Sequence, residues 1–266
     1  MNITNAHTHI FPHAIALKAS TAIGHFYDDL TMWGDGTLET LKQNCADCGI
    51  TRCLTHSVAT TAAQVTKIND FIAASVAQSS GLLVGFATMH PDFEDMAGEL
   101  DRAKELGLVG VKLHPDMQRF AIDDPRAMRL YELMCQRSMP LVAHTGDRRY
   151  DFSNPDRTAR VCRAFPELKI QAAHFGGYSC WEDAMEKLEG LGLYTDTSSS
   201  FFEIDDALAL RLIRFFGADH VMFGSDYPMW NAKDELERLN DLPLNEDERR
   251  LILNDTADRF LDPAVR

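Results

Sequence analysis

The chain of 266 residues lacks any apolar run of about 18 residues, the length that a membrane-spanning helix needs. Its first residues lack the basic start and apolar stretch of a secretory signal peptide. No proline-rich or serine-rich linker divides it, and no internal repeat appears beyond an alternation of helices and strands. We therefore expect a soluble, cytoplasmic protein without a membrane partner, folded as a single domain over residues 1–266.

Positive charge is also scarce. The chain has 26 lysines and arginines against 40 aspartates and glutamates, a formal net charge of −14. A polyanion such as a nucleic-acid backbone would be repelled by this charge. Nucleic acid is therefore not an expected partner.

Cysteines are few and widely spaced: the six lie at Cys45, Cys48, Cys53, Cys135, Cys162 and Cys180. This spacing is unlike the dense framework of a small disulfide-bonded domain. Cys45 and Cys48 match the Cys-x-x-Cys pattern, but the chain has no second pair of this kind. We expect reduced thiols that serve as small, mostly buried side chains.

What the chain does have is a regular alternation of short apolar runs with amphipathic segments, many of which end at a glycine such as Gly49, Gly81 or Gly107. This pattern is typical of repeated βα units around a parallel sheet. Eight runs read as strands, beginning near Ile3, Arg52, Leu82, Val109, Pro140, Lys169, Leu193 and Val221. Eight such units predict an α/β fold of the closed (β/α)8 barrel class.

Two segments depart from this rhythm. The connection from Ile10 to Gly36 is long and carries Phe11, Phe26, Tyr27 and Trp33. Long connections in compact domains are often functional, so it is a candidate lid or pocket wall, and a surface insertion is the alternative. At the other end of the chain, a capping-box pattern predicts a helix over 245–262 that closes the outer ring.

Histidines recur where the predicted strands end. His7 and His9, two residues apart on the first strand, lie on one face of it because side chains alternate with period two. The later strand ends carry Lys112 with His114, His144, His174 and Asp226. The carboxyl ends of barrel strands meet at one face, so these side chains are expected to share one bowl.

Each of these histidines alone has an ordinary structural explanation, such as capping a helix or bonding a backbone carbonyl. Their joint placement favours a metal centre, because imidazoles and carboxylates are the ligands of Zn²⁺ and of other divalent ions. These residue types also fit Mn²⁺, Fe²⁺ or Co²⁺.

The ordered motifs His-x-His, Gly-Val-Lys-Leu-His-Pro, His-Thr-Gly, Ala-His-Phe-Gly-Gly and Phe-Gly-Ser-Asp-Tyr-Pro extend from Asn5 to Pro228. Together they resemble the amidohydrolase superfamily. The closest resemblance is to its amidohydrolase-related (amidohydrolase 2) branch, which also contains amino-carboxymuconate-semialdehyde decarboxylase. The resemblance implies a barrel of the metal-dependent hydrolase type.

The resemblance also implies roles for single residues. His7, His9, His144 and Asp226 would ligate the metal, with one zinc ion favoured over two. Asp226 would also move the proton of the activated water, and His174 would stand beside that water as the second catalytic residue.

Lys112 and His114 have two interpretations. In several members of the superfamily a lysine at this position is carboxylated and bridges two metals, which would recruit His174 as a ligand of the second ion. In the one-metal branch, Lys112 would instead pair with Asp226 or with a substrate carboxylate.

The substrate side is less defined by the sequence. Arg148 and Arg149 follow the fifth strand and could bind a substrate carboxylate, or they could pair with Asp147 or Asp151. Tyr178 and Trp230 are candidate pocket walls, with packing at the barrel rim as the alternative.

Three functions follow from these observations. The first is metal-dependent hydrolysis of an amide, lactone or ester bond in a small organic molecule. The second is non-oxidative decarboxylation of an unsaturated or aromatic acid, and the third is metal binding without catalysis. The expected partner is a small-molecule substrate. Whether this substrate is a carboxylate, and whether the chain forms a homo-oligomer, are left open by the sequence.

Overall fold

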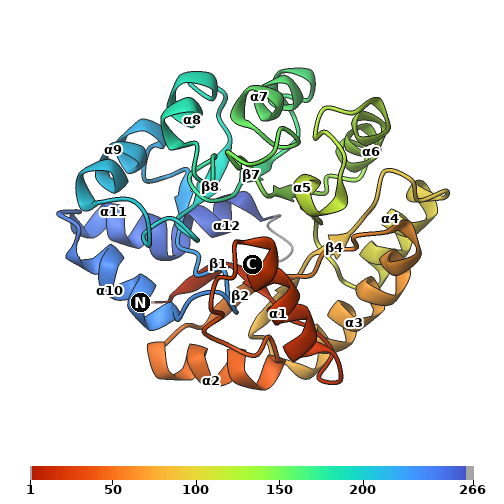
Figure 1. Ribbon diagram of the computed structural model, residues 1–266, viewed down its shortest axis with the longest axis horizontal. Coiled ribbons are helices and arrows are strands. Elements are labelled where there is room, and N and C mark those ends of the chain that lie inside the picture. Colours follow the sequence, from red (N-terminus) through yellow and green to blue (C-terminus); the bar gives the residue numbers. More distant parts are fainter. Residues whose placement is uncertain (1, 262–266) are drawn as a thin grey trace.

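The computed structural model describes residues 2–261, which fold as a barrel of parallel strands inside a ring of helices (Figure 1). Two parallel sheets build the barrel, one with the order β1-β2-β3 and one with the order β4-β5-β6-β7-β8-β9. The strands are β1 (Thr4–His9), β2 (Arg52–His56), β3 (Leu83–Gly85), β4 (Ala87–Thr88), β5 (Val111–Leu113), β6 (Leu141–Ala143), β7 (Ile170–Ala172), β8 (Tyr194–Asp196) and β9 (Val221–Met222).

Backbone hydrogen bonds close the two sheets into one barrel. On one side, Ala6 donates to the Phe223 carbonyl at 2.7 Å, and a parallel bridge joins Thr8 to Tyr227. On the other side, Phe86 donates to Thr55 and the next residue, Ala87, donates to Gly110. The predicted (β/α)8 barrel is therefore confirmed.

The predicted third strand, near 82–89, is interrupted at Phe86, which separates β3 from β4. Phe86 is fully buried and stacks on Phe260, with ring centroids 6.2 Å apart. Residues from several strands join this pair in one apolar cluster, among them Ala6, Leu54 and Met222. The C-terminal segment thus plugs the barrel interior below the histidines, instead of only closing the outer ring as expected.

The helices surround the strands (Figure 1). They are α1 (Ala16–Phe26), α2 (Leu38–Cys48), α3 (Val65–Gln78), α4 (Met96–Glu105), α5 (Pro115–Gln118), α6 (Pro125–Cys135), α7 (Pro155–Ala164), α8 (Trp181–Lys187), α9 (Asp206–Phe216), α10 (Ala232–Asp241), α11 (Glu246–Arg250) and α12 (Thr256–Phe260). A 3₁₀ turn, η1 (Ala62–Gln64), precedes α3, and a π-helical turn, η2 (Leu251–Asp255), joins α11 to α12.

Local sequence signals explain most of the helix ends. The Thr37 side chain accepts from the Thr40 amide at the start of α2, and Asp205 accepts from Leu208 at the start of α9. Gly49 ends α2 in the left-handed conformation, with φ 69°, which a residue without a side chain adopts without strain.

The structure corrects the other expected boundaries. The connection over 10–36 is not all loop, because α1 occupies its middle. Helix α10 was not predicted. The helix predicted over 245–262 is three short helical pieces that end at Phe260, and residue 262 lies outside the described residues. All six cysteines are free thiols, as expected.

None of the helices in the described part of the chain is long and apolar enough to cross a membrane.

Candidate active site

The predicted site residues gather at the carboxyl ends of the strands, on the floor of one open pocket of about 900 Å³. His7, His9, Lys112, His144, His174 and Asp226 all line it. The pocket walls come from α1, from η1 and α3, and from the loops after β5 and β9. The structure therefore brings together side chains that are up to 219 positions apart in the chain, the difference between His7 and Asp226.

Two imidazoles converge on one carboxylate. Asp226 Oδ1 lies 3.5 Å from His7 Nε2 and 3.3 Å from His9 Nε2. The other carboxylate oxygen of Asp226 accepts a 2.6 Å hydrogen bond from Ser199 Oγ, which fixes its orientation. Trp230 in turn donates to Ser199 Oγ at 2.9 Å.

Hydrogen bonds fix the tautomer of His7. Its Nδ1 lies 3.1 Å from Asp196 Oδ2, and an ionised carboxylate can only accept, so Nδ1 carries the proton. The lone pair is then on Nε2, the atom that faces Asp226. Burial, together with the nearby Lys112 charge, lowers the pKa of His7 to about 4, despite Asp196 and Asp226. His7 is therefore neutral near pH 7, the state that binds metal.

A second chain of hydrogen bonds runs through His174 and His144. His174 Nδ1 donates to the Ser198 carbonyl at 3.0 Å, so its Nε2 carries the lone pair. That lone pair faces His144 Nδ1 at 3.0 Å, which places the proton of His144 on Nδ1. His144 Nε2 consequently has a free lone pair, and it is buried without a hydrogen-bond partner. The His174 ring lies 4.9 Å from the His7 ring and so connects His144 to the first group.

Lys112 is almost completely buried, and its Nζ lies 3.0 Å from His7 Nε2. Burial lowers the pKa of Lys112 to about 8, against the opposing effect of Asp226 and Asp196. Within residues 2–261, Lys112 makes no ion pair with a carboxylate, including Asp226, the partner considered from the sequence. The floor thus holds a buried amine that no carboxylate of the described residues contacts.

His114 lies beside His144, but its two ring nitrogens bond other residues. Its Nδ1 accepts from the Met117 amide at 3.3 Å, so its Nε2 carries the proton and donates to the Tyr27 hydroxyl at 2.9 Å. Its ring stacks on that of His144, with centroids 4.0 Å apart. Both nitrogens of His114 therefore have a hydrogen-bond partner within the protein, and its ring packs against His144.

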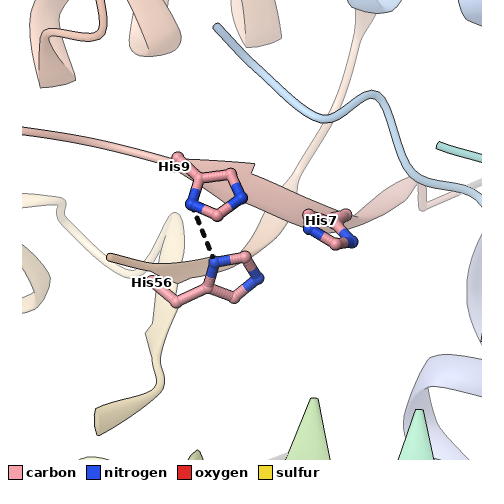
Figure 2. A group of neighbouring side chains, drawn as sticks. All are labelled: His7, His9 and His56. Carbon is pink, nitrogen blue, oxygen red and sulfur yellow. Dashed lines mark hydrogen bonds between the residues drawn. The ribbon is translucent and has the colours of Figure 1, made fainter. Parts of the chain in front are cut away.

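Sequence reasoning missed three polar residues of this site. His56, at the end of β2, lies with Nδ1 3.3 Å from His9 Nδ1 (Figure 2). Asp196, at the end of β8, orients His7. Asp116, which follows Pro115, has its Oδ2 3.9 Å from His144 Nε2. His56 and Asp196 carry the same sequence signal as the predicted site residues, a polar residue at the end of an apolar strand.

These residues fit a metal ion. Atoms able to ligate lie within 4.8 Å of one another in three groups of described residues: His7, His9 and His56; His7, His174 and Asp196; and His114, Asp116 and His144. His56 Nε2, His144 Nε2 and Asp116 Oδ1 are buried and have no hydrogen-bond partner among residues 2–261. Unpartnered buried lone pairs are costly unless a cation or proton meets them.

The predicted substrate arginines are paired instead of free. Arg148 forms an ion pair with Glu203 at 3.1 Å, and Arg149 forms one with Asp147 at 2.7 Å and one with Asp28 at 3.0 Å. The structure places neither among the described residues that line the pocket. Arg149 also lies over the ring of Tyr27, 5.2 Å from its centroid, so it clamps the segment after α1 to the loop after β6.

The two predicted wall residues also lie outside the set that lines the pocket. Tyr178 is nevertheless beside the centre, with its ring 5.7 Å from His144 and 5.9 Å from His174. Trp230 stacks on Phe202, with centroids 4.9 Å apart, and supports Asp226 through Ser199. Of the aromatics in 10–36, Phe11, Phe26 and Tyr27 line the pocket, whereas Trp33 is 44% exposed and does not.

The fold and this floor define a barrel enzyme whose reactive groups lie at the carboxyl ends of the strands. The family model described as amidohydrolase matches residues 5–262. The chain therefore belongs to the amidohydrolase family, as its motifs predicted.

Solved structures of the same fold have two kinds of activity in their descriptions. A 2,6-dihydroxybenzoate decarboxylase complexed with 2,6-dihydroxybenzoate matches with a TM-score of 0.73 and 18% identity, over 98% of this chain and 99% of that one. A probable 2-pyrone-4,6-dicarboxylic acid hydrolase from Acinetobacter baumannii, with citric acid bound, matches with a TM-score of 0.71 and 16% identity, over 98% and 99%.

A third similar structure contains a metal. It is a dihydroxybenzoic acid decarboxylase from Polaromonas sp. with bound manganese and the inhibitor 2-nitroresorcinol, with a TM-score of 0.72 and 17% identity over 98% of this chain and 97% of that one. At these identities, the similarity is one of fold.

Proposed function

We propose that the chain is a metal-dependent hydrolase that cleaves an amide, lactone or ester bond in a small organic molecule. The observation that carries this proposal is the convergence of His7 Nε2 and His9 Nε2 on Asp226 Oδ1 at the floor of the pocket. Together with His144 Nε2, these atoms supply the neutral nitrogens and the carboxylate that a catalytic zinc site uses.

A divalent ion held by His7, His9, His144 and Asp226 would supply Lewis acidity toward the substrate carbonyl and would acidify water. Zinc is the first expectation, and manganese, iron(II) and cobalt(II) suit the same ligand types. One ion is favoured over two, because Lys112 contacts His7 and both nitrogens of His174 are occupied.

The chain's own residues would then move the protons. Asp226 Oδ1 is the buried base nearest the centre and can take a proton from water and return it to the leaving group. His174 is held by Ser198 through Nδ1 and accepts from His144 through Nε2, so its ring is fixed beside His7 and His144 Nε2 keeps its free lone pair. The pocket above these groups is lined mainly by apolar side chains.

Non-oxidative decarboxylation is the second candidate, and Lys112 is the observation that favours it. A buried amine without a carboxylate partner is suited to receive the carboxylate of an acid substrate. In that reaction the bond between carbon and carboxylate breaks, its electron pair stays on the carbon, carbon dioxide leaves, and a proton from solvent, relayed by His174 or Asp226, takes its place. A purely metal-binding role leaves the open pocket above the centre unexplained.

The test is an assay of metal-reconstituted protein on two panels, one of cyclic amides, lactones and esters and one of unsaturated and aromatic acids. We expect turnover on the first panel, and a large loss of it with Asp226→Asn. Carbon dioxide released from the acids, with no hydrolysis, would overturn the first candidate in favour of the second. A small-molecule partner follows from either reaction, whereas a homo-oligomer and the cytoplasmic location stay predictions.

A further inference from the structure

The outer half of the pocket has a different character from the floor. Helix α1 presents Ala19, Ile23 and Phe26 to the cavity, with Ile15 just before the helix, at the spacing of one helical face. Helix α1 crosses in front of the barrel end in Figure 1. These four residues belong to none of the apolar core clusters of the described chain. Their apolar face therefore covers the pocket instead of the barrel.

Helix α3 forms part of another wall. Ile68 and Phe71 line the cavity from this helix, and Ala63 lines it from η1. A cavity of about 900 Å³ is near the upper end of the range for small-ligand sites. Such a space can hold an extended apolar body above the reactive floor.

Two positive charges lie where this apolar wall opens to solvent. Lys67 of α3 and Arg119 at the end of α5 both line the pocket and are exposed. Among residues 2–261, neither side chain has an ion pair or a hydrogen bond to the protein. Of the described residues that line the cavity, the only carboxylates are Asp116 and Asp226, and both are buried at the floor. In a chain of net charge −14, the described rim therefore has two cations and no anion of its own.

The backbone that carries Arg119 is firmly held. Arg119 has φ 58°, a left-handed conformation that glycine or asparagine usually occupies. Its neighbour Gln118 is buried and donates to the carbonyls of Ala59 and Met89, both at 2.8 Å. The bond to Ala59 ties the turn to the chain just before η1 and α3, the elements that lead to Lys67, and the bond to Met89 ties it to the end of β4. The two cations are thus mounted on connected walls of one cavity.

We propose that the pocket takes an elongated amphipathic acid, with its reactive group on the floor, an apolar body against α1 and α3, and a second anionic group at Arg119 and Lys67. This proposal rests on the proposed function for the reactive end only. It assigns specificity to the rim pair Lys67 and Arg119 in place of Arg148 and Arg149, whose charges are already paired.

The test is calorimetric binding of unreactive probes to the purified protein at low salt. Aliphatic dicarboxylic acids from adipate to dodecanedioate are compared with the monocarboxylic acid of the same chain length. The wild type should bind a dicarboxylate of suitable length roughly 5-fold more tightly than its partner, the value of one exposed ion pair. Salt should reduce this preference because the rim is exposed.

In the double variant Lys67→Gln and Arg119→Gln, the preference should disappear while the monoacids still bind. Arg163→Gln is the matched control, because Arg163 is an exposed arginine without a described carboxylate partner, on α7 and outside the pocket. Its preference should equal that of the wild type. The proposal would be refuted if the wild type binds neither probe or shows no preference for the dicarboxylate at any length. A double variant that keeps this preference would also refute it.

These probes have no bond to hydrolyse, so the result is independent of the catalytic proposal. If neither substrate panel is turned over but the dicarboxylate preference is intact, the proposed reaction is refuted and the assignment of Lys67 and Arg119 is supported. If one panel is turned over but no dicarboxylate preference is found, the proposed reaction is supported and the assignment of Lys67 and Arg119 is refuted.

Discussion

The floor and the outer wall of the pocket differ in the elements that form them, in burial and in polarity. Floor side chains come from strand ends, are buried, and mostly have a second hydrogen bond that fixes their orientation, as Asp196 does for His7 and Ser199 does for Asp226. Wall side chains come from α1 and α3, are partly exposed, and are mainly apolar. In the functions proposed above, the strand ends therefore supply the reactive groups, and the connecting segments supply the surface that would select the substrate.

The largest effect should come from the floor, with Asp226→Asn. The amide keeps the shape and can still accept from Ser199, but it cannot serve as a base. We expect turnover to fall about 10²- to 10⁴-fold, the usual value of general acid and base catalysis. The melting temperature, measured by circular dichroism, should change little. Unchanged turnover would show that the floor does not perform the reaction.

A smaller effect is expected one layer behind the floor, with Asp196→Asn. The carboxylate of Asp196 keeps the proton of His7 on Nδ1 and so leaves the Nε2 lone pair facing the centre. Loss of such a partner typically weakens metal affinity about 10- to 100-fold. Competition with a chelator measures this affinity. An affinity equal to that of the wild type would mean that His7 needs no orienting partner.

The wall should respond least, and in a different parameter. Ile23→Ala removes part of the apolar face of α1 without touching the core clusters. The KM should rise about 3- to 10-fold with kcat nearly constant, because uniform binding is lost. Leu17→Ala is the matched control on the same helix, since Leu17 is 71% exposed and is not among the residues that line this pocket. A fall in kcat with unchanged KM would show that the wall contributes to the reaction step, as the floor does, and not to substrate binding.

The sequence predicted the floor better than the wall for a physical reason. Glycines and helix caps mark where strands end, so histidines at those ends could be placed on one face before any contact was known. His56 shows the same signal and was overlooked. Ion pairs such as Arg148 with Glu203 join residues far apart in the chain, and only the folded structure brings them together.

Helix α1 was missed because its start has no signal. Ile15, the residue just before the helix, makes no side-chain capping bond, and the apolar face of α1 lines the pocket instead of the core. The interruption at Phe86 was likewise not predictable, since it depends on a stacking partner, Phe260, from the other end of the chain.

Elemental analysis of the purified protein, beside its His7→Ala variant, tests the central claim most directly. The wild type should contain close to one equivalent of a divalent metal, and His7→Ala should lose most of it while staying folded. A wild type that takes up no metal on reconstitution, or a variant that retains its full content, would contradict a metal centre at this floor.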